Sequence, residues 1–326
     1  MEDLIQAMKA AGEPTRMRIL LVLHRSELTV SELCRILGQS QPRVSRHLKL
    51  LCDAGLLHRQ AEGTSAYYRH SATPFARSFL SSMRPLAELE SHVLLSDQRQ
   101  LAAVRADRAE LATRPAEKMA AEEALLAEHR VPVAAVEDAM LTVAADLDLD
   151  HLLDIGTGTG RVLELFGPHI AGGTGIELSR DMLNLARTTL DALDLHHCSV
   201  VHGNAYTLDV AVGSMSMTVL HHVLHFLDEP SRAVEQAAAT VTPGGRLLIV
   251  DFAPHQVDDL RAEHGHRRLG FSDAEVEGWC REAGLTDIAI SHLGPDGIDD
   301  PALTVTIWQA RQRADAPHTR RLEAVV

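Results

Sequence analysis

The chain has 326 residues, of which 45% are hydrophobic and 23% charged, so its length predicts two globular domains. No apolar run reaches the roughly 18 residues of a membrane span, and residues 1–16 lack the basic start and apolar core of a signal peptide. The net charge of −14 is uneven, because residues 1–72 carry 10 Lys and Arg against 7 Asp and Glu, whereas the remainder carries a net −17.

The charge distribution and the cysteine content indicate which partners and which cellular compartment to expect. A polyanion would be attracted to the N-terminal part and repelled by the rest. The four cysteines, Cys34, Cys52, Cys198 and Cys280, include no CxxC pair, so neither a disulfide framework nor a zinc ribbon is expected. We therefore expect a cytoplasmic protein with no membrane partner and no bound metal.

The first elements are predicted to be helices. Residues 4–23 carry apolar positions at helical spacing, interrupted at "GEPTR". In "ELTVSELCRILG", Thr29 and Glu32 form a capping-box pattern, and Gly38 is suited to end the helix. A short step leads to Ser40, a suitable N-cap, and to Pro42 in the first turn of a helix that should run to about residue 54.

The segment "LLHRQAEGTSAYYRHS" alternates around its central Glu-Gly pair and predicts a β-hairpin. Helix, helix, short turn, helix and hairpin in this order predict a winged helix-turn-helix of the α+β class over residues 1–73. The alternative is an exposed basic helix in an ordinary helical domain. The residues expected to reach phosphates or base edges of DNA are Ser40, Gln41, Arg43, Ser45, Arg46, His47, Lys49 and, in the hairpin, Arg59.

Residues 7–70 resemble the ArsR/SmtB-type repressors in "GEPTRMRIL", "LTVSELCRILGQSQPRVSRHLKLLCDAGLL" and "YYRH". The resemblance implies a homodimer that binds an inverted-repeat operator in double-stranded DNA. It also raises metal sensing, because that family's arsenic and cadmium sensors carry a Cys-x-Cys pair on the helix before the turn. Here Cys34 is followed by Ile36, and one thiolate cannot make a trigonal soft-metal site. We expect Cys34 to be a buried apolar residue and the signal to be read elsewhere in the chain.

The rest of the chain divides by composition and periodicity. Residues 74–130 are rich in Ala, Leu and charge, and predict a helical dimerisation and connector region, with one helix packing beside the DNA-binding domain. Residues 131–312 predict an α/β doubly wound domain with a parallel sheet and helices on both faces. The tail, residues 313–326, is expected to be disordered. The expected strands are 151–155, 173–177, 197–202, 215–220 and 246–251, followed by an added hairpin in "TDIAISHL" and "ALTVTIWQAR".

A glycine-rich loop follows the first of these strands in "LLDIGTGTGRVLEL". Its glycines are Gly156, Gly158 and Gly160, and Arg161 stands where a dinucleotide-binding loop has its late glycine. The next strand ends at Glu177 in "GTGIELS", where a carboxylate can accept both hydroxyls of a ribose. The alternative is a doubly wound domain in which the loop is only a tight turn.

This spacing resembles the class I S-adenosylmethionine-dependent methyltransferases from about residue 130 to 310, through "LLDIGTGTG", "HGNAY" and "VLHHVLHFLDEP…TPGGRLLIVDF". The resemblance implies that S-adenosyl-L-methionine or S-adenosyl-L-homocysteine is the ligand. Asn204 stands where that family usually has Asp, and the segment before the domain lacks the aromatic residue that many of these enzymes use. The resemblance assigns Asp154 and Gly156 to the methionine end, Glu177 to the ribose, Asn204 and Ala205 to adenine, and Thr157, Gly158, Gly160 and Leu178 to the rest of the cofactor site.

Histidines are the remaining candidates for chemistry. Three follow the fourth expected strand, His221, His222 and His225, and three follow the fifth, His255, His264 and His266. His221 and His222 are the candidate catalytic bases, because histidine suits proton transfer near neutral pH. The spacing of His221 and His225 also allows a metal, and the plain alternative is that these histidines line a pocket wall or a helix surface.

The two halves together predict a dimeric DNA-binding transcriptional regulator whose methyltransferase-like domain binds S-adenosylmethionine or S-adenosylhomocysteine, with methionine-cycle genes as targets. The alternative is an active methyltransferase acting on a small molecule, with a fused autoregulatory DNA-binding domain. A third reading, a quinone-type C-methyltransferase, rests on a general likeness of the second half. An arsenic methyltransferase is not expected, since no cysteine cluster lies near the glycine-rich loop.

Overall fold

The computed structural model describes residues 1–62, 65–71, 73–88, 92–111, 129, 131–294 and 303–314. The chain divides into two compact units, Met1–Thr113 with Asp191–His196, and Arg114–Leu190 with His197–Val326. Nearly all of the tail expected to be disordered, residues 315–326, and residues 112–128 of the expected connector lie outside the described part.

The first unit is a winged helix-turn-helix, which confirms the predicted class. Its helices and strands are α1 (Glu2–Ala11), α2 (Pro14–Leu23), β1 (Leu28–Thr29), α3 (Val30–Leu37), α4 (Gln41–Asp53), β2 (Leu57–Glu62) and β3 (Ser65–His70). The hairpin β2–β3 is joined by β1 in a sheet of order β1-β3-β2. Two residues are too few to show strand periodicity, so β1 could not be found in the sequence.

Local signals in the sequence account for the helix boundaries in this unit. Thr29 and Glu32 form a reciprocal capping box at the start of α3, and Gly38 ends it in the left-handed conformation with φ of 66°. Val44 and Leu48 on α4 are fully buried in the core of the unit. Their burial leaves the opposite face of α4 available to a partner.

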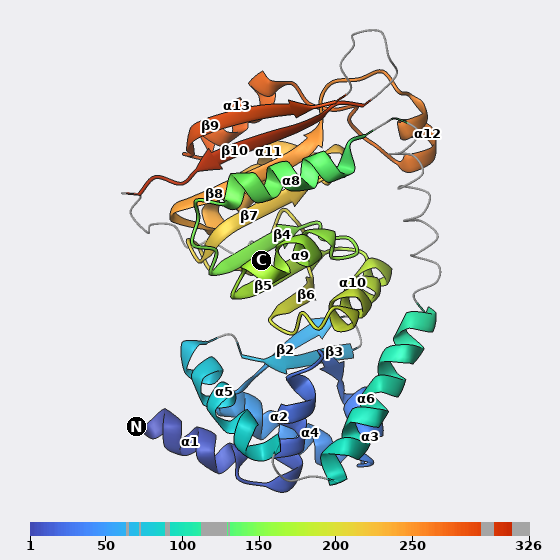
Figure 1. Ribbon diagram of the computed structural model, residues 1–326, viewed down its shortest axis with the longest axis vertical. Helices are drawn as coiled ribbons and strands as arrows, with labels where there is room; N and C mark the ends of the chain where they lie inside the picture. The colour runs from blue at the N-terminus through green and yellow to red at the C-terminus, as the bar shows by residue number, and fades with distance from the viewer. Residues whose placement is uncertain are drawn as a thin grey trace. The chain divides into compact units, whose positions relative to one another are not determined.

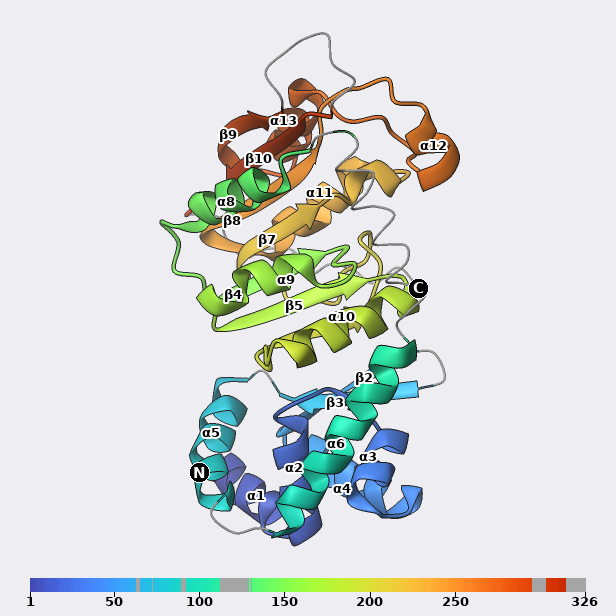
Figure 2. The same ribbon diagram turned by 45° about the vertical axis from the view of Figure 1, so that its right-hand side comes forward.

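Two further helices, α5 (Pro74–Glu88) and α6 (His92–Leu111), follow the hairpin. Both contribute to the same core, through Phe79 on α5 and Leu101 on α6, although only one helix was expected to pack there. Figure 2 shows α6 beside α2 and α3, and one ion pair joins it to each of these helices. Asp97 accepts two hydrogen bonds from Arg18, at 2.7 and 2.6 Å, and Arg108 donates two to Glu32, at 2.7 and 2.8 Å.

The second unit alternates helices and strands (Figure 1). They are α8 (Val133–Ala144), β4 (His151–Ile155), α9 (Arg161–Phe166), a 3-10 helix (Gly167–His169), β5 (Gly172–Glu177), α10 (Arg180–Ala192), β6 (Cys198–His202), β7 (Met215–His221), a second 3-10 helix (Leu224–Phe226), α11 (Pro230–Thr240), β8 (Val241–Phe252), α12 (Asp259–His264), α13 (Asp273–Glu282), β9 (Thr286–Leu293) and β10 (Val305–Arg311).

Its seven strands form a single sheet of order β6-β5-β4-β7-β8-β10-β9. The five strands expected to be parallel, β4 to β8, are parallel, and the sheet becomes mixed where β10 runs antiparallel to both β8 and β9. The last two strands pair as the predicted added hairpin, which joins the sheet through β10 beside β8 and leaves β9 at the edge. Which strand a hairpin pairs with depends on tertiary contacts. The alternation of apolar and polar residues within its own strands therefore does not predict it.

The sheet carries packed layers on both faces. Leu153, Ile155, Leu247 and Ile249 pack with α11 and α13 in one apolar cluster. The carboxyl ends of the parallel strands β4, β5 and β7 meet at one edge of the sheet, which is where open α/β sheets bind their ligands. Among the described helices, none combines the length and apolar character that crossing a membrane requires.

Candidate functional site

The glycine-rich loop connects β4 to α9, and its backbone conformation explains its composition. Gly156, Gly158 and Gly160 have φ values of 75°, 54° and 87°, a region that residues with a Cβ rarely adopt. At Gly156 an added Cβ would lie 2.4 Å from Cγ2 of Val223, so this position also lacks space. At Gly158 an added Cβ would meet no atom within 4 Å, which leaves the backbone bare toward the space it borders.

Asp154 lies beneath this loop and is fully buried. The hydroxyl of Thr157 donates a 2.5 Å hydrogen bond to its Oδ2, while its Oδ1 is buried without a hydrogen-bond partner among the described residues. Burial raises the pKa of Asp154 to about 7, because removal from water penalises the carboxylate. Asp154 therefore supports the loop from below.

Glu177 ends β5 opposite the loop, and its carboxylate is held by two backbone donors. The N–H of Gly158 donates to Oε2 at 3.1 Å, and the N–H of Ser179 donates to Oε1 at 2.7 Å. Each carboxylate oxygen has further lone pairs, so Glu177 can still accept hydrogen bonds from a ligand.

A cavity of about 780 Å³ opens at this edge of the sheet. That size falls in the range of small-molecule and cofactor sites. The structure places Asp154 and Gly160 outside its wall. The other nine residues predicted for cofactor binding or catalysis line it: Gly156, Thr157, Gly158, Glu177, Leu178, Asn204, Ala205, His221 and His222.

Several residues that line the cavity were not predicted from the sequence. Glu137 on α8 accepts two hydrogen bonds from Arg161 at the start of α9, at 2.7 and 2.9 Å, and both line the cavity. This pair joins α8 to the glycine-rich loop, and its partners are 24 residues apart, beyond any local pattern. Phe226 also lines the cavity, so an aromatic side chain follows β7 although the segment before the domain has none.

The adenine candidate Asn204 has a fixed amide. Its Oδ1 accepts a 3.0 Å hydrogen bond from the backbone N–H of Tyr206. This bond orients the amide so that its NH₂ group can donate to a ring nitrogen and its second oxygen lone pair can accept from an amino group.

Histidines gather at the ends of β7 and β8. His221 and His222 line the cavity, whereas His225 is buried behind them and pairs its Nδ1 with Oδ1 of Asp251 at 2.7 Å. Burial lowers the pKa of His221 to about 4 and that of His222 well below its usual range, so both imidazoles are neutral near pH 7. Of the second expected group, His266 stacks on His225 with ring centroids 4.0 Å apart, and His264 ends α12 away from any such contact among the described residues.

The predicted DNA contacts lie mostly on the open face of α4 and on β2. Six are exposed: Ser40, Gln41, Arg43, Arg46, Lys49 and Arg59. Ser45 is half-buried. His47 lies apart from them, because its Nδ1 is 3.6 Å from Oε2 of Glu13, the N-cap of α2, and only 12% of its side chain is exposed.

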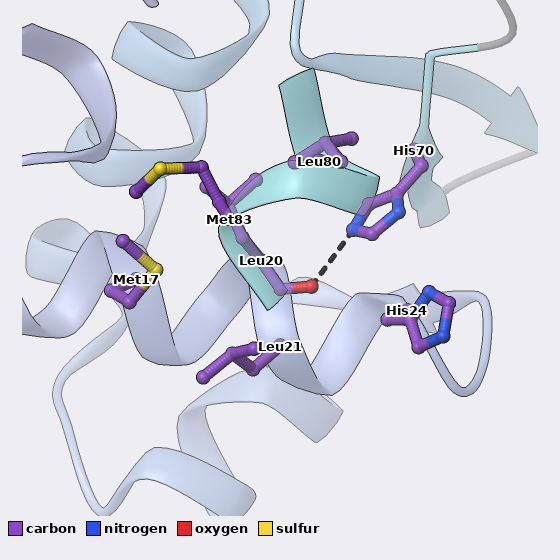
Figure 3. Close-up of a pocket in the computed structure, with 7 residues that line it drawn as sticks. All are labelled: Met17, Leu20, Leu21, His24, His70, Leu80 and Met83. Atoms are coloured by element: carbon purple, nitrogen blue, oxygen red, sulfur yellow. Dashed lines mark hydrogen bonds between the residues drawn. The ribbon is translucent and has the colours of Figure 1, made fainter. Parts of the chain in front are cut away.

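A pocket between α2, β3 and α5 in the first unit has a volume of only about 20 Å³ (Figure 3). That is room for a water molecule and not for a nucleoside. His70 closes it by donating a 2.8 Å hydrogen bond from Nε2 to the backbone oxygen of Leu20. Burial lowers the pKa of His70 to about 4, so its ring is neutral. Cys34 on α3 is half-buried beside the buried Ile36, and burial raises the pKa of its thiol.

Comparison with protein families matches two segments of the chain. The family described as bacterial regulatory proteins of the arsR family matches residues 13–59, and the methyltransferase domain family matches residues 153–249. The first segment spans the turn and α4, and the second spans the glycine-rich loop, Glu177 and the histidines after β7.

Individual relatives divide in the same way. The chain is 46% identical over 68 residues to the arsenical resistance operon repressor of Escherichia coli, covering 21% of this chain and 58% of the repressor. It is 28% identical over 104 residues to a ubiquinone biosynthesis O-methyltransferase of Coxiella burnetii, covering 30% of this chain and 42% of that enzyme. The chain thus matches between about two fifths and three fifths of the length of these relatives.

Solved structures align with a little over half of the chain. The YcgJ protein of Bacillus subtilis is 16% identical, with 54% of this chain and 97% of that chain aligned and a TM-score of 0.48. Phosphoethanolamine N-methyltransferase 2 of Haemonchus contortus, in complex with S-adenosyl-L-methionine, is 12% identical, with 55% and 52% aligned and a TM-score of 0.49. By its two family matches and its own sheet order, the chain joins an arsR-type helix-turn-helix to a class I methyltransferase fold.

Proposed function

We propose that this protein is a cytoplasmic, homodimeric transcriptional regulator that binds an inverted-repeat operator through α4 and β2. S-adenosylmethionine or S-adenosylhomocysteine, bound in the methyltransferase-like unit, would set its affinity for DNA. Genes of the methionine cycle are the proposed targets, because their products make and consume these two ligands. The observation that carries the proposal is the difference in cavity size, about 780 Å³ beside the glycine-rich loop against about 20 Å³ beside α2.

The donor and acceptor groups of the larger cavity fit this ligand class. Glu177 is held by two backbone N–H groups and can accept from the ribose hydroxyls. Asn204 and Ala205, beyond the end of β6, would contact adenine. Gly158 leaves its backbone bare where the methionine part would lie. The apolar wall formed by Phe226 and Leu227 would exclude water from the ligand.

The residues on α4 support the DNA part of the proposal. Arg43, Arg46 and Lys49 are exposed, while Val44 and Leu48 are buried and seat the helix. Three cations on one exposed helix face would be attracted to the phosphates of DNA. His47, which faces Glu13, would stabilise the helix orientation rather than read a base.

A second candidate function is methyl transfer to a small molecule, and the histidines on the cavity wall favour it. S-adenosylmethionine supplies an electrophilic methyl group when it is bound. His221 ends β7 and His222 follows it, and both lie on the cavity wall, where they could orient an acceptor by hydrogen bonds. The DNA-binding unit would then control expression of the enzyme itself.

Direct ligand titration tests the proposal. We expect calorimetry on the full chain to give one site per chain for S-adenosylmethionine and for S-adenosylhomocysteine. Adenosine should bind more weakly, because it lacks the part that reaches the loop. Formation of S-adenosylhomocysteine on incubation with a metabolite extract would favour the enzyme. If neither ligand binds, both candidate functions are wrong.

A further inference from the structure

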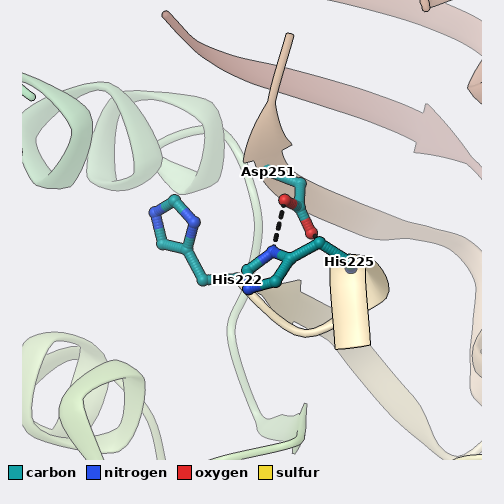
Figure 4. A group of neighbouring side chains, drawn as sticks. All are labelled: His222, His225 and Asp251. Atoms are coloured by element: carbon teal, nitrogen blue, oxygen red, sulfur yellow. Dashed lines mark hydrogen bonds and ion pairs between the residues drawn. The ribbon is translucent and has the colours of Figure 1, made fainter. Parts of the chain in front are cut away.

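A cluster of metal-binding side chains lies behind the cavity wall, at the carboxyl ends of β7 and β8. His222 follows β7 directly, His225 lies in the 3-10 helix Leu224–Phe226, and Asp251 is the penultimate residue of β8. One ligand atom from each of the three lies within 4.8 Å of the other two. Figure 4 shows the rings of His222 and His225 on the same side of the Asp251 carboxylate.

We propose that His222, His225 and Asp251 bind one divalent transition-metal cation of the zinc and iron class. Two imidazoles and one carboxylate are ligands that such cations prefer, and this set leaves coordination positions open. Because His222 also lines the cavity, an open position would face the bound small molecule. This proposal departs from the sequence-based expectation of no metal, and it uses His222 where the spacing had pointed to His221.

The backbone of His222 supports the assignment. The residue has a φ of 50°, a left-handed conformation that is uncommon outside glycine and in which Asn, Asp and His are the most frequent other residues. Its N–H donates a 2.8 Å hydrogen bond to the backbone oxygen of Val250, next to Asp251. This hydrogen bond holds the backbone of His222 against the end of β8, one residue before Asp251.

Unsatisfied nitrogen atoms are the second observation. The Nδ1 atom of His222 is buried and has no hydrogen-bond partner among the residues that the structure describes. The same holds for Nδ1 of His266, whose ring stacks on that of His225. Buried polar atoms in folded proteins nearly always have partners, so such an atom beside a histidine–carboxylate pair indicates a missing ligand.

Hydrogen bonds from surrounding residues hold the other two proposed ligands, Asp251 and His225, as is usual for metal ligands. The carboxylate of Asp251 accepts hydrogen bonds from the backbone N–H of Phe252, at 2.8 Å, and of His225, at 3.4 Å. The backbone oxygen of His225 accepts from the N–H groups of Arg267 and Arg268, at 2.8 and 3.2 Å. The loop after α12 thus fixes His225 in place.

The ligand atoms must draw together when a cation binds. Atoms at about 2.1 Å from a tetrahedral cation are about 3.4 Å apart, so separations of up to 4.8 Å require shifts of up to about 1 Å. Asp251 and His225 are buried and hydrogen-bonded, whereas His222 is half-buried at the cavity wall. The closing movement therefore belongs to the His222 side chain, and the cation would replace the proton between His225 and Asp251.

Cobalt and zinc titrations test the site. The full chain is stripped with a chelator and titrated with Co²⁺, whose visible absorption reports coordination, and with Zn²⁺ in equilibrium dialysis. We expect one equivalent per chain to bind tightly. Asp251→Asn and His222→Asn should each weaken this binding by at least about 100-fold, because losing even an outer-shell partner costs about 10- to 100-fold.

The matched control is His221→Asn, which alters the neighbouring residue on the same wall but leaves all three ligands in place and should bind the cation as the wild type does. Asparagine tolerates the left-handed conformation of position 222, so His222→Asn carries the test if Asp251→Asn fails to fold. Binding that is absent from the wild type, or equal in the wild type and His222→Asn, would overturn the proposal. The readout is the cation itself, so this failure leaves the ligand proposal intact.

Discussion

The carboxylate of Glu177 accepts a hydrogen bond from the backbone N–H of Gly158 at 3.1 Å, which joins the end of β5 to the glycine-rich loop. The two residues approach the same space from neighbouring parallel strands, and both line the large cavity. The hydrogen bond ties the position of the Glu177 carboxylate to the loop, so the affinity of this site should depend on the path of the loop.

The path of the loop can be tested at Gly156. An alanine Cβ would lie 2.4 Å from Cγ2 of Val223, so Gly156→Ala should abolish binding of S-adenosylmethionine and lower stability. Gly284→Ala is the matched control, because φ there is 84° but the space is open, and it should cost only the backbone penalty of about 1–2 kcal/mol. Val223→Ala in the Gly156→Ala background should restore part of the binding measured by calorimetry. No recovery would show that the contact with Val223 is not the cause.

Arg46 tests the DNA-binding face. Arg46→Ala should weaken binding to a duplex selected from random-sequence DNA by the wild-type protein, and reduce the salt dependence by up to about one unit of slope. Arg99→Ala removes the same charge from the exposed surface of α6 and should change neither. Fluorescence anisotropy at several salt concentrations gives both quantities. If Arg46→Ala behaves like Arg99→Ala, Arg46 does not contact DNA.

Cys34 predicts the response to soft metals. Its partner position on α3 holds the buried Ile36, and the half-buried thiol has a raised pKa, so the reactive thiolate is disfavoured. Arsenite and cadmium should therefore leave the DNA complex intact at concentrations that keep the protein folded. Mobility-shift titrations of the wild type and Cys34→Ser should coincide. A stoichiometric release that Cys34→Ser removes would contradict this expectation.

His70 predicts a pH dependence of stability. Its pKa is about 4 in the folded chain and about 6.5 in the unfolded chain, so the unfolded chain binds the extra proton between these values. Stability must then fall as the pH falls through this window, by up to roughly 3 kcal/mol at pH 4. His70→Gln cannot titrate but can still donate to the oxygen of Leu20. In denaturant unfolding, the wild type should lose stability relative to His70→Gln between pH 7 and pH 4, and a constant difference would argue against a neutral buried ring.

Local sequence patterns predicted much of this fold. The ends of α3 could be predicted from the sequence, because the capping box of Thr29 and Glu32 and the left-handed Gly38 have their hydrogen-bond partners within four residues. The tight loop could be predicted from Gly156 and Gly158, because its φ values at these two positions suit glycine. The features that sequence could not show all depend on distant partners: the place of β10 between β8 and β9, the Glu137–Arg161 pair on the cavity wall, and the burial of Asp154 beneath the loop.

The histidines show the same limit more sharply. Their positions after two strands were evident, but which of them face the cavity depends on the register of β7 against β8, where His221 lies opposite Val250. That register brings His222 beside Asp251, a residue that no pattern in the sequence singles out. Similarly, the spacing of His47 predicted a position on the exposed face of α4. Its ring instead lies beside the carboxylate of Glu13 at the start of α2.

The central claim is that the ligand site controls DNA affinity, and one measurement tests it most directly. S-adenosylmethionine and S-adenosylhomocysteine are titrated calorimetrically into wild type and Glu177→Ala, with and without operator DNA. Loss of charge-assisted hydrogen bonds should weaken ligand binding to the variant by roughly 1.5–3 kcal/mol, about ten- to a hundredfold, while its intrinsic DNA affinity is unchanged. Because coupling is reciprocal, DNA must change the wild type's ligand affinity by the same factor by which the ligand changes its DNA affinity. Equal ligand affinities with and without DNA would contradict the regulator and leave the methyltransferase as the remaining function.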